Sequence, residues 1–267
     1  MILGYLDPIA FHLFSKPIYW YGIIIAITVL AAYMMADHEA TKRGLKKDTM
    51  LDLLLLALPI AFIFARAYYV VFRWDYYSTR KSEIIAIWDG GIAIYGGLLG
   101  GFLVLYFFAR HRRIKIIKML DIIAPSLLVG QMLGRWGNFF NHEAYGEVVS
   151  RGFLEKRFIP NFIIENMYID GAYHQPTFLY ESLWCFIALV ILLLIRKKLA
   201  QSEVFAMYIV LYGIERFVVE GMRTDSLYIG SLRVSQVLSL VFVIGSLIYL
   251  IMLNTKYKDK KVLYIES

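Results

Sequence analysis

The sequence predicts an all-α integral membrane protein with about seven transmembrane helices. Of its 267 residues, 60% are hydrophobic, and the mean hydropathy is +0.60. A soluble protein has about 45–50% apolar residues. The 16% aromatic residues fit belts of Trp and Tyr at the two membrane interfaces.

Seven runs are long and apolar enough to cross a bilayer as helices of about 20 residues. The fourth and sixth are the most polar, and the third is rich in glycine. In chain order the predicted spans are Pro17–Ala36, Leu51–Phe72, Gly91–Ala109, Met119–Phe140, Thr177–Ile195, Val204–Met222 and Ser235–Leu253.

Basic residues in the short loops predict the orientation, because cytoplasmic loops are enriched in Lys and Arg. Most of the 28 such residues fall in the loops after spans one, three and five and in the C-terminal tail. We therefore expect the N-terminus outside and the C-terminus in the cytoplasm. The loop at about 141–176 contains Gly152, Pro160 and Gly171 and should form a small external cap. One polytopic domain should cover residues 1–267, with no removable signal peptide.

Several functional classes are disfavoured. The net charge of +7 could suggest nucleic-acid binding, but the excess lies in predicted cytoplasmic loops, so we expect no nucleic-acid partner. Cys185 is the single cysteine and lies in an apolar run, where a packing role is the simpler interpretation. The five histidines lack metal-ligand spacing, and we expect no metal or organic cofactor.

Polar residues are concentrated in the predicted outer half of the spans. The run from Gly134 to Gly146 places Arg135 and Asn138 at the outer end of span four. A charged side chain deep in a bilayer costs about 2.5–3.5 kcal/mol or more, and such residues usually mark a functional site. Arg66, Tyr95 and Glu181 fall at a similar depth.

Arg216, Glu220 and Arg223 have the spacing i, i+4, i+7, which places them on one face of a helix. Glu220 could hold one or both arginines. Alternatively, the pair could be an interhelical salt bridge with no other role. With Arg135 added, two or three arginines face one carboxylate, and we expect spare positive charge that would bind a lipid phosphate. The glycines of span three could allow close helix packing or contact a head group.

The run Gly134-Arg135-x-Gly137-Asn138-Phe139-x-Asn141-x-Glu143-x-x-Gly146 resembles the signature of bacterial prolipoprotein diacylglyceryl transferases, particularly those of Firmicutes. The resemblance extends from about Asp7 to Gln236. Its other motifs are Trp20-Tyr21-Gly22, Asp89-Gly90-Gly91, Gly96-Gly97, Asp121 with Ala124-Pro125, Pro176-Thr177 with Leu179-Tyr180-Glu181, and Arg216 with Glu220 and Arg223.

The resemblance implies a transferase of the bacterial cytoplasmic membrane. It would move the diacylglyceryl group of phosphatidylglycerol to the lipobox cysteine in the signal peptide of a prolipoprotein, forming a thioether and releasing glycerol 1-phosphate. Its partners would be the lipid, these signal peptides and the bilayer. The expected catalytic residues are Arg135, Arg216, Tyr95 and Glu220. The expected substrate-binding residues are Tyr21, Asn138, Asn141, Glu143, Gly146, Arg223, Gly96, Gly97, Tyr180 and Glu181.

Two positions depart from the resemblance. Tyr95 stands where the family often has histidine, and Gln175 stands before Pro176 where another histidine is common. A phenol with a pKa near 10 is a poor general base at neutral pH. We therefore expect Tyr95 to position a head group or thiol by a hydrogen bond. The simpler alternative is an aromatic anchor at the membrane interface.

An anion or lipid transporter using the same arginines is the alternative function. A transport path requires polar groups through the whole depth of the membrane, whereas the inner halves of these spans carry few. A receptor or scaffold would have no need of the set formed by Arg135, Arg216 and Glu220.

Overall fold

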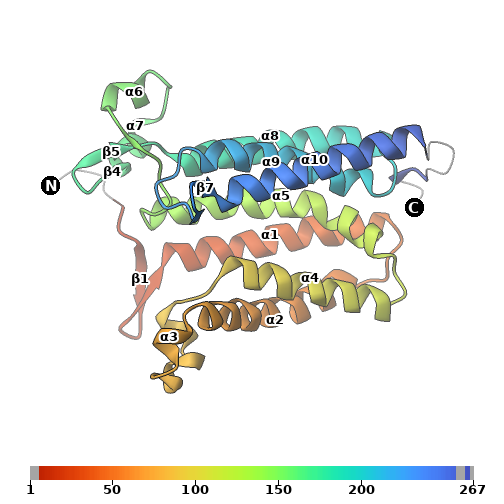
Figure 1. Cartoon of the computed structure of the whole chain (residues 1–267), viewed down its shortest axis with the longest axis horizontal. Helices are drawn as coiled ribbons and strands as arrows, with labels where there is room; N and C mark the ends of the chain where they lie inside the picture. The colour runs from red at the N-terminus through yellow and green to blue at the C-terminus, as the bar shows by residue number, and fades with distance from the viewer. Residues whose placement is uncertain (1–5, 257–261, 265–267) are drawn as a thin grey trace. The chain divides into compact units, whose positions relative to one another are not determined.

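The computed structural model describes residues 6–256 and 262–264. Helices dominate, which confirms the predicted all-α class (Figure 1). The chain divides into two compact units, one of Met1–Met35 with Ile123–Ser267 and one of Ala36–Ile122. Both boundaries fall within helices, α1 (Trp20–Lys42) and α5 (Ile116–Phe140). The single domain expected from the sequence stays a prediction.

The first unit is a helical bundle preceded by a hairpin. Strands β1 (Ile9–Leu13) and β2 (Lys16–Tyr19) pair antiparallel and lead into α1. After α5 come α8 (Thr177–Ile195), η3 (Arg196–Lys198) and α9 (Glu203–Glu220). A second hairpin, β6 (Tyr228–Ile229) with β7 (Leu232–Arg233), leads into α10 (Val234–Thr255). Helices α8, α9 and α10 lie side by side (Figure 1).

Side chains of α5, α8 and α9 share one apolar core. The core of this bundle includes Leu128 on α5, Cys185 and Leu192 on α8, and Val204 on α9, each with no exposed surface. Cys185 is thus a buried packing residue, as the sequence predicted. This core fixes the faces that α5, α8 and α9 present to one another, and the polar site lies on those faces.

The segment at 141–176 forms the predicted small folded cap, although its side of the membrane stays a prediction. It contains β3 (Val148–Val149), α6 (Arg151–Glu155), α7 (Asn161–Asn166), β4 (Tyr168–Ile169) and β5 (Ala172–His174). The strands form an antiparallel sheet in the order β3-β5-β4. Its apolar core, including Leu154 and Ile164, packs on Phe139 of α5 and Phe178 of α8.

The second unit is built on α2 (Thr49–Phe72) and α4 (Ile94–His111), joined by α3 (Trp74–Tyr77), η1 (Lys81–Ile85) and η2 (Ile87–Asp89). Glycines allow the two long helices to touch. A Cβ on Gly96 would lie 2.4 Å from the carbonyl oxygen of Phe64, and one on Gly100 would lie 2.8 Å from the Cβ of Phe64. The packing interpretation is therefore confirmed for Gly96 and Gly100.

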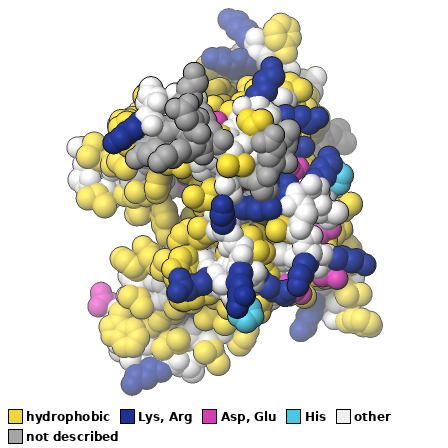
Figure 2. Space-filling view, turned by 90° about the vertical axis from the view of Figure 1, so that its right-hand side faces the viewer, with side chains coloured by type: hydrophobic (Ala, Val, Ile, Leu, Met, Phe, Trp, Pro, Cys, Tyr) yellow, Lys and Arg dark blue, Asp and Glu magenta, His cyan; other side chains and the backbone are white. Residues whose placement is uncertain are grey.

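Basic side chains meet at one end of this second unit. The Nζ of Lys118 donates to the carbonyl oxygen of Arg43 at 2.9 Å, and Arg112 forms an ion pair with Asp52. Many Lys and Arg side chains gather on the face shown in Figure 2. This fits the predicted cytoplasmic loops, but the orientation itself stays a prediction. Of the basic residues in the C-terminal tail, which the sequence predicts to be cytoplasmic, Lys258, Lys260 and Lys261 lie outside the described residues.

All seven predicted spans are helices whose ends differ from prediction by a few residues, apart from the later end of α1. Six of them are long and apolar enough to cross a membrane. The seventh, α9, carries Glu203, Glu215, Arg216 and Glu220 within its 18 residues, so its hydropathy alone does not mark it as a span. The number of crossings therefore stays a prediction, and α9 is the helix on which it depends.

The close contact at Gly96 gives a stability test with a neighbouring control. Gly96→Ala should lower the free energy of unfolding by about 1–3 kcal/mol, because the added methyl overlaps the backbone of α2. Gly97→Ala should be neutral or stabilising by up to about 1 kcal/mol, because its Cβ would make ordinary contacts at 3.7 Å and Ala favours helix. Unfolding in detergent measures both. Equal stability of the two variants would contradict the packing role of Gly96.

Candidate functional site

An ion-pair network joins three helices of the first unit. Arg135 of α5 pairs with Glu181 of α8, and the Nη1 of Arg216 on α9 lies 3.6 Å from the same carboxylate oxygen. The Nη2 of Arg216 lies 2.6 Å from the Oε2 of Glu220, one helical turn later. We call Arg135, Glu181, Arg216 and Glu220 the arginine cluster. The sequence placed all four among the site residues, and the structure brings them together.

The two carboxylates of the cluster are almost completely enclosed by protein, whereas the arginines keep some exposure. The side chains of Glu181 and Glu220 are 1% and 2% exposed, and those of Arg135 and Arg216 about one-fifth. An isolated buried charge would be very costly, so each charge depends on its partners. Removing one partner from a buried ion pair typically costs about 3–5 kcal/mol. Glu181 is the central member, because it contacts both arginines.

Several atoms of the cluster make ion pairs without hydrogen bonds. Glu181 Oε1, Arg216 Nη1 and Glu220 Oε2 are buried and have no hydrogen-bond partner among the described residues. The opposite charges are therefore close together, but these three atoms do not make hydrogen bonds with good geometry. Arg216 in particular retains an N–H group that could donate to a ligand oxygen.

Glu215 is a member of this region that the sequence reasoning missed. Its side chain is buried at 3% exposure, and neither carboxylate oxygen has a hydrogen-bond partner in the described part of the chain. It interacts electrostatically with Glu181, Arg135 and Arg216. The available signal was a glutamate directly beside Arg216 in an apolar span, a position that is costly unless it is used.

The expectation of spare positive charge was wrong. Glu181 and Glu220 match Arg135 and Arg216 in number, and Glu215 adds a third acidic group. The sequence suggested one carboxylate because residues on different helices could not be paired from spacing along one helix. Any anion that binds must therefore compete with these carboxylates for the arginines.

Arg223 also departs from the predicted arrangement. Helix α9 ends at Glu220, so Arg223 does not continue its face. It instead makes two hydrogen bonds to Asp225, at 2.9 and 2.7 Å. Burial opposes the ionisation of Asp225, but the hydrogen bonds and charge of Arg223 outweigh this effect and lower the pKa of Asp225 below its usual value. Arg223 is thus held by its own carboxylate and not by Glu220.

The residues that follow Arg135 in the sequence signature form a turn that is hydrogen-bonded to the end of α5. The side chain of Asn138 accepts a 3.4 Å hydrogen bond from Arg135 and donates at 2.9 Å to Glu143. The N–H of Glu143 donates to the carbonyl oxygen of Asn138 at 3.0 Å. Asn138 therefore connects the arginine cluster to Glu143.

Tyr21 and Asn141 line an open cavity of about 650 Å³ with Pro17, Ile18, Tyr19 and Gly22. The ring of Tyr21 packs on Gly137, where an added Cβ would lie 2.9 Å from it. Glycine at 137 is thus required for Tyr21 to reach this position. These two predicted binding residues border one cavity.

Gly146 lies where the cap meets the end of α9. Its N–H donates to the carbonyl oxygen of Gln175 at 2.9 Å, and it forms an isolated β-bridge with Arg223. An added Cβ would lie 2.9 Å from the Cβ of Gln175. Gly146 thus has a clear packing role. Tyr180 packs in the cap core, and its buried hydroxyl has no hydrogen-bond partner among the described residues.

Tyr95, Gly96 and Gly97 belong to the other unit, on the first turn of α4. Tyr95 is half-buried there. That these three residues join the arginine cluster stays a prediction.

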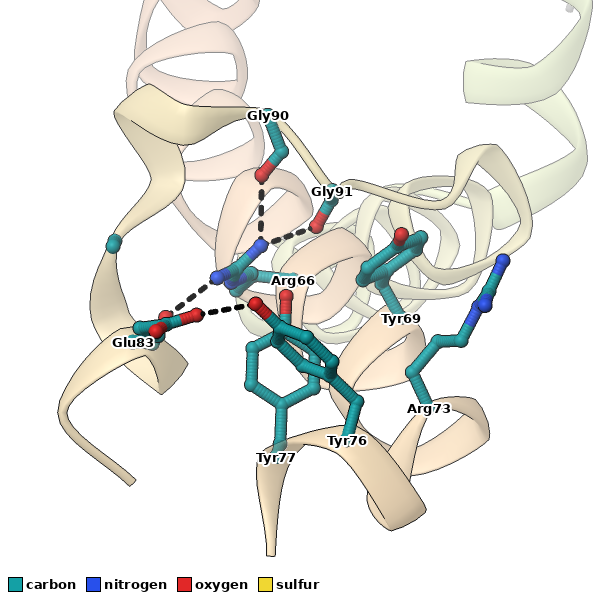
Figure 3. Close-up of a pocket in the computed structure, with 9 residues that line it drawn as sticks. Arg66, Tyr69, Arg73, Tyr76, Tyr77, Glu83, Gly90 and Gly91 are labelled. Carbon is teal, nitrogen blue, oxygen red and sulfur yellow. Dashed lines mark hydrogen bonds between the residues drawn. The ribbon is translucent and has the colours of Figure 1, made fainter. Parts of the chain in front are cut away.

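Arg66, also in the second unit, has a backbone role. Its guanidinium donates to four carbonyl oxygens, those of Glu83, Ile84, Gly90 and Gly91, at 2.7–2.8 Å. Figure 3 shows the bonds to Glu83, Gly90 and Gly91. It forms no ion pair with a described residue. The glycines at 90 and 91 therefore serve Arg66 through their carbonyl groups.

Among the residues at 6–256 and 262–264, no three His, Cys, Asp or Glu side chains gather in a way that could hold a metal ion.

Comparison with known proteins identifies the family. A sequence model described as prolipoprotein diacylglyceryl transferase matches residues 8–252. The chain belongs to this family. It is 53% identical over 259 residues to the phosphatidylglycerol–prolipoprotein diacylglyceryl transferase of Bacillus velezensis, covering 96% of each chain.

Two further relatives with the same name give similar values. The protein of Lysinibacillus sphaericus is 50% identical and covers 93% of this chain and 94% of its own. The protein of Limosilactobacillus reuteri is 52% identical, and the alignment covers 94% of this chain and 92% of that protein. With its apolar helices, this family member is a multi-pass protein of the bacterial cytoplasmic membrane.

The contacts of Glu181 and Glu215 predict different effects on stability when each residue is replaced by glutamine. Glu181→Gln should destabilise the protein by about 3–5 kcal/mol, because both arginines lose their shared counter-charge. Glu215→Gln should leave the stability unchanged or raise it, because it removes a buried carboxylate without a hydrogen-bond partner. Thermal unfolding in one detergent compares the two matched changes. Greater destabilisation by Glu215→Gln would show that Glu215 has the more important partners.

Proposed function

We propose that this protein transfers the diacylglyceryl group of phosphatidylglycerol to the thiol of the lipobox cysteine in prolipoprotein signal peptides, with the arginine cluster as its catalytic centre. The products are a thioether-linked lipid and glycerol 1-phosphate. Family membership supports the reaction. The enclosed network of Arg135, Glu181, Arg216 and Glu220 is the observation that supports the site.

The reaction replaces one bond by another. The substrate's sulfur bonds to the terminal glyceryl carbon as the bond from that carbon to the phosphate oxygen breaks. The phosphodiester, with one negative charge, becomes a phosphomonoester, which carries more. Arginine donors already fixed at this point would stabilise the developing charge in a site that excludes water. Arg216 Nη1 retains donor capacity for this purpose.

The nucleophile is the thiol of the substrate. Cys185 is fully buried in the apolar core of α5, α8 and α9, where it cannot meet a peptide. Asn138, Glu143 and Arg223 are assigned to substrate binding beside the arginines. Tyr21 and Asn141 are assigned the same role because they line one cavity. Gly146, Tyr180 and Glu181 are also assigned to substrate binding.

Glu215 is assigned as the acceptor of the thiol proton. Glu181 and Glu220 are paired with arginines, whereas the carboxylate of Glu215 accepts no hydrogen bond from a described residue. Transfer of the proton to Glu215 would generate the thiolate as sulfur attacks carbon. It would also remove a negative charge from the region where the phosphate gains one.

An assay with purified protein, phosphatidylglycerol and a lipobox peptide tests the proposed function directly. Lipid attached to the peptide cysteine, with release of glycerol 1-phosphate, is the expected result. A peptide with serine in place of cysteine is the control. Movement of lipid or anion across a vesicle membrane without peptide modification would favour the transporter alternative.

Loss of either central arginine should greatly reduce transfer. Arg135→Ala and Arg216→Ala should each raise the barrier by about 2.7–4 kcal/mol, a loss of roughly 100- to 1000-fold in rate. Arg→Lys should also be poor, because Lys cannot form the planar two-donor contact with phosphate. Arg112→Ala, which removes the ion pair with Asp52, is the control and should stay within about twofold. Near-normal rates for both cluster variants would limit the arginines to a structural role.

Glu215→Gln gives a pH test. Without an acceptor, the reaction would depend on thiolate already present, and that fraction rises about tenfold per pH unit below the thiol pKa of about 8.5. The variant should therefore be slow at pH 7 and regain activity as the pH rises towards 9. Initial rates of variant and wild type across this range measure the effect. Parallel pH profiles would remove Glu215 from proton transfer.

Tyr95, Gly96 and Gly97 are assigned to the same reaction, with Tyr95 donating or accepting a positioning hydrogen bond. Tyr95→His should be active, Tyr95→Phe slower and Tyr95→Ala slowest, because alanine also removes contacts of the ring. Initial rates at equal membrane abundance separate hydrogen bonding from anchoring. A fully active Tyr95→Phe would leave only the aromatic-anchor alternative.

A further inference from the structure

A second polar pocket lies in the unit formed by Ala36–Ile122, at the C-terminal end of α2. Its volume is about 280 Å³, and its lining includes Arg66, Tyr69, Arg73, Tyr77, Glu83 and Gly91 (Figure 3). It shares no residue with the arginine cluster. Pockets for drug-sized ligands occupy about 300–1,000 Å³, so this one suits a head group better than a whole lipid.

The wall of this pocket is fixed in advance. Arg66 is 7% exposed and holds the segment from Glu83 to Gly91 through its four backbone contacts. Gly91 has a φ of +71°, and a Cβ there would lie 2.6 Å from Arg66 Nη1 and 2.8 Å from the ring of Tyr69. The loop can therefore follow this path only with glycine at position 91. A ligand would meet groups that need no reordering.

The charge of the pocket favours an anion. Arg66 donates its N–H groups to uncharged carbonyl oxygens, and it forms no ion pair with a carboxylate that the structure describes. Arg73, at the end of α2, makes no ion pair or hydrogen bond through its side chain with a described residue. The single acidic group described in the lining, Glu83, accepts a hydrogen bond from Tyr76 at 2.8 Å and lies 4.0 Å from Arg80. Two positive charges thus face one carboxylate that already has partners.

The polar side chains that line this pocket lie on two sides of Arg66. Figure 3 places Arg66 between Glu83 on one side and Tyr69 with Arg73 on the other. The hydroxyls of Tyr69 and Tyr77 make no hydrogen bond with a described residue, so they can donate to a ligand. One side therefore suits a phosphate, and the Glu83 side suits hydroxyl groups that donate to a carboxylate.

We propose that this pocket is a second binding site, for a phosphoglycerol group whose phosphate lies at Arg73 and Tyr69 and whose hydroxyls lie towards Glu83. The group could belong to a phosphatidylglycerol molecule or to free glycerol phosphate. The link to phosphatidylglycerol rests on the proposed function, whereas the recognition of phosphate with adjacent hydroxyls rests on the pocket.

Binding is measured in the Arg216→Ala variant, which weakens the arginine cluster, so that remaining binding reports on this pocket. Calorimetry with sn-glycerol 1-phosphate tests the free anion, and nanodiscs with and without phosphatidylglycerol test the lipid. One saturable site is expected with at least one of the two probes. Adding Arg73→Gln should weaken it about tenfold or more, and Tyr69→Phe should weaken it by a smaller factor.

Arg80→Gln is the matched control. Arg80 is an exposed arginine near Glu83 that does not line the pocket, and its loss should change affinity by less than about twofold. Equal affinities for the Arg73→Gln and Arg80→Gln variants would overturn the proposal. Inorganic phosphate that binds as tightly as glycerol phosphate would overturn its glycerol part. An active wild-type enzyme with no such binding refutes the pocket alone, whereas failed lipid transfer with intact binding refutes the proposed function alone.

Discussion

The contact of one buried carboxylate with two arginines is the constraint on which the site depends. Glu181 joins Arg135 of α5 to Arg216 of α9, and its own helix, α8, packs against both through a core of Leu128, Cys185 and Val204. The apolar core and the ion pairs therefore both require α5, α8 and α9 to turn the same faces towards one another. A shift of one helix that suited packing alone would leave charges unpaired in a buried region, which is far more costly than an imperfect apolar contact.

The same network explains how polar residues can be kept in an apolar bundle. Arg216 and Glu220 are one turn apart, so a single helix supplies one complete pair, and the partner for Arg135 comes from across the bundle. The paired charges lie close together, but several of their atoms make no hydrogen bond with a described residue. A network of this kind links three helices, and it leaves the Nη1 of Arg216 without a hydrogen-bond partner among the described residues. Glu215 adds a buried carboxyl group without a hydrogen-bond partner among the described residues, and our proposal assigns it the thiol proton.

The sequence predicted the helices well because apolar length is a local property. The arginines and Glu181 were also found, since charged residues are conspicuous in apolar runs. Partners were predicted less well, because pairing across helices depends on their packing. Glu220 was expected to hold one or both arginines on its helix, whereas Arg223 lies beyond the end of α9 and pairs with Asp225. Glu215 was missed beside the more prominent Arg216. The backbone role of Arg66 could not be read from residue types, because its partners are carbonyl groups that every residue possesses.

The link between Arg66 and Gly91 has a consequence for how this chain can diverge. The guanidinium of Arg66 occupies the space in which any side chain at position 91 would begin, and it also holds the backbone that gives Gly91 its conformation. Neither residue can change alone without disturbing the other. A relative with a side chain at 91 should therefore have a shorter residue at 66 and a different course of the intervening loop. Positions 66 and 91, although 25 residues apart, should therefore change together among related proteins.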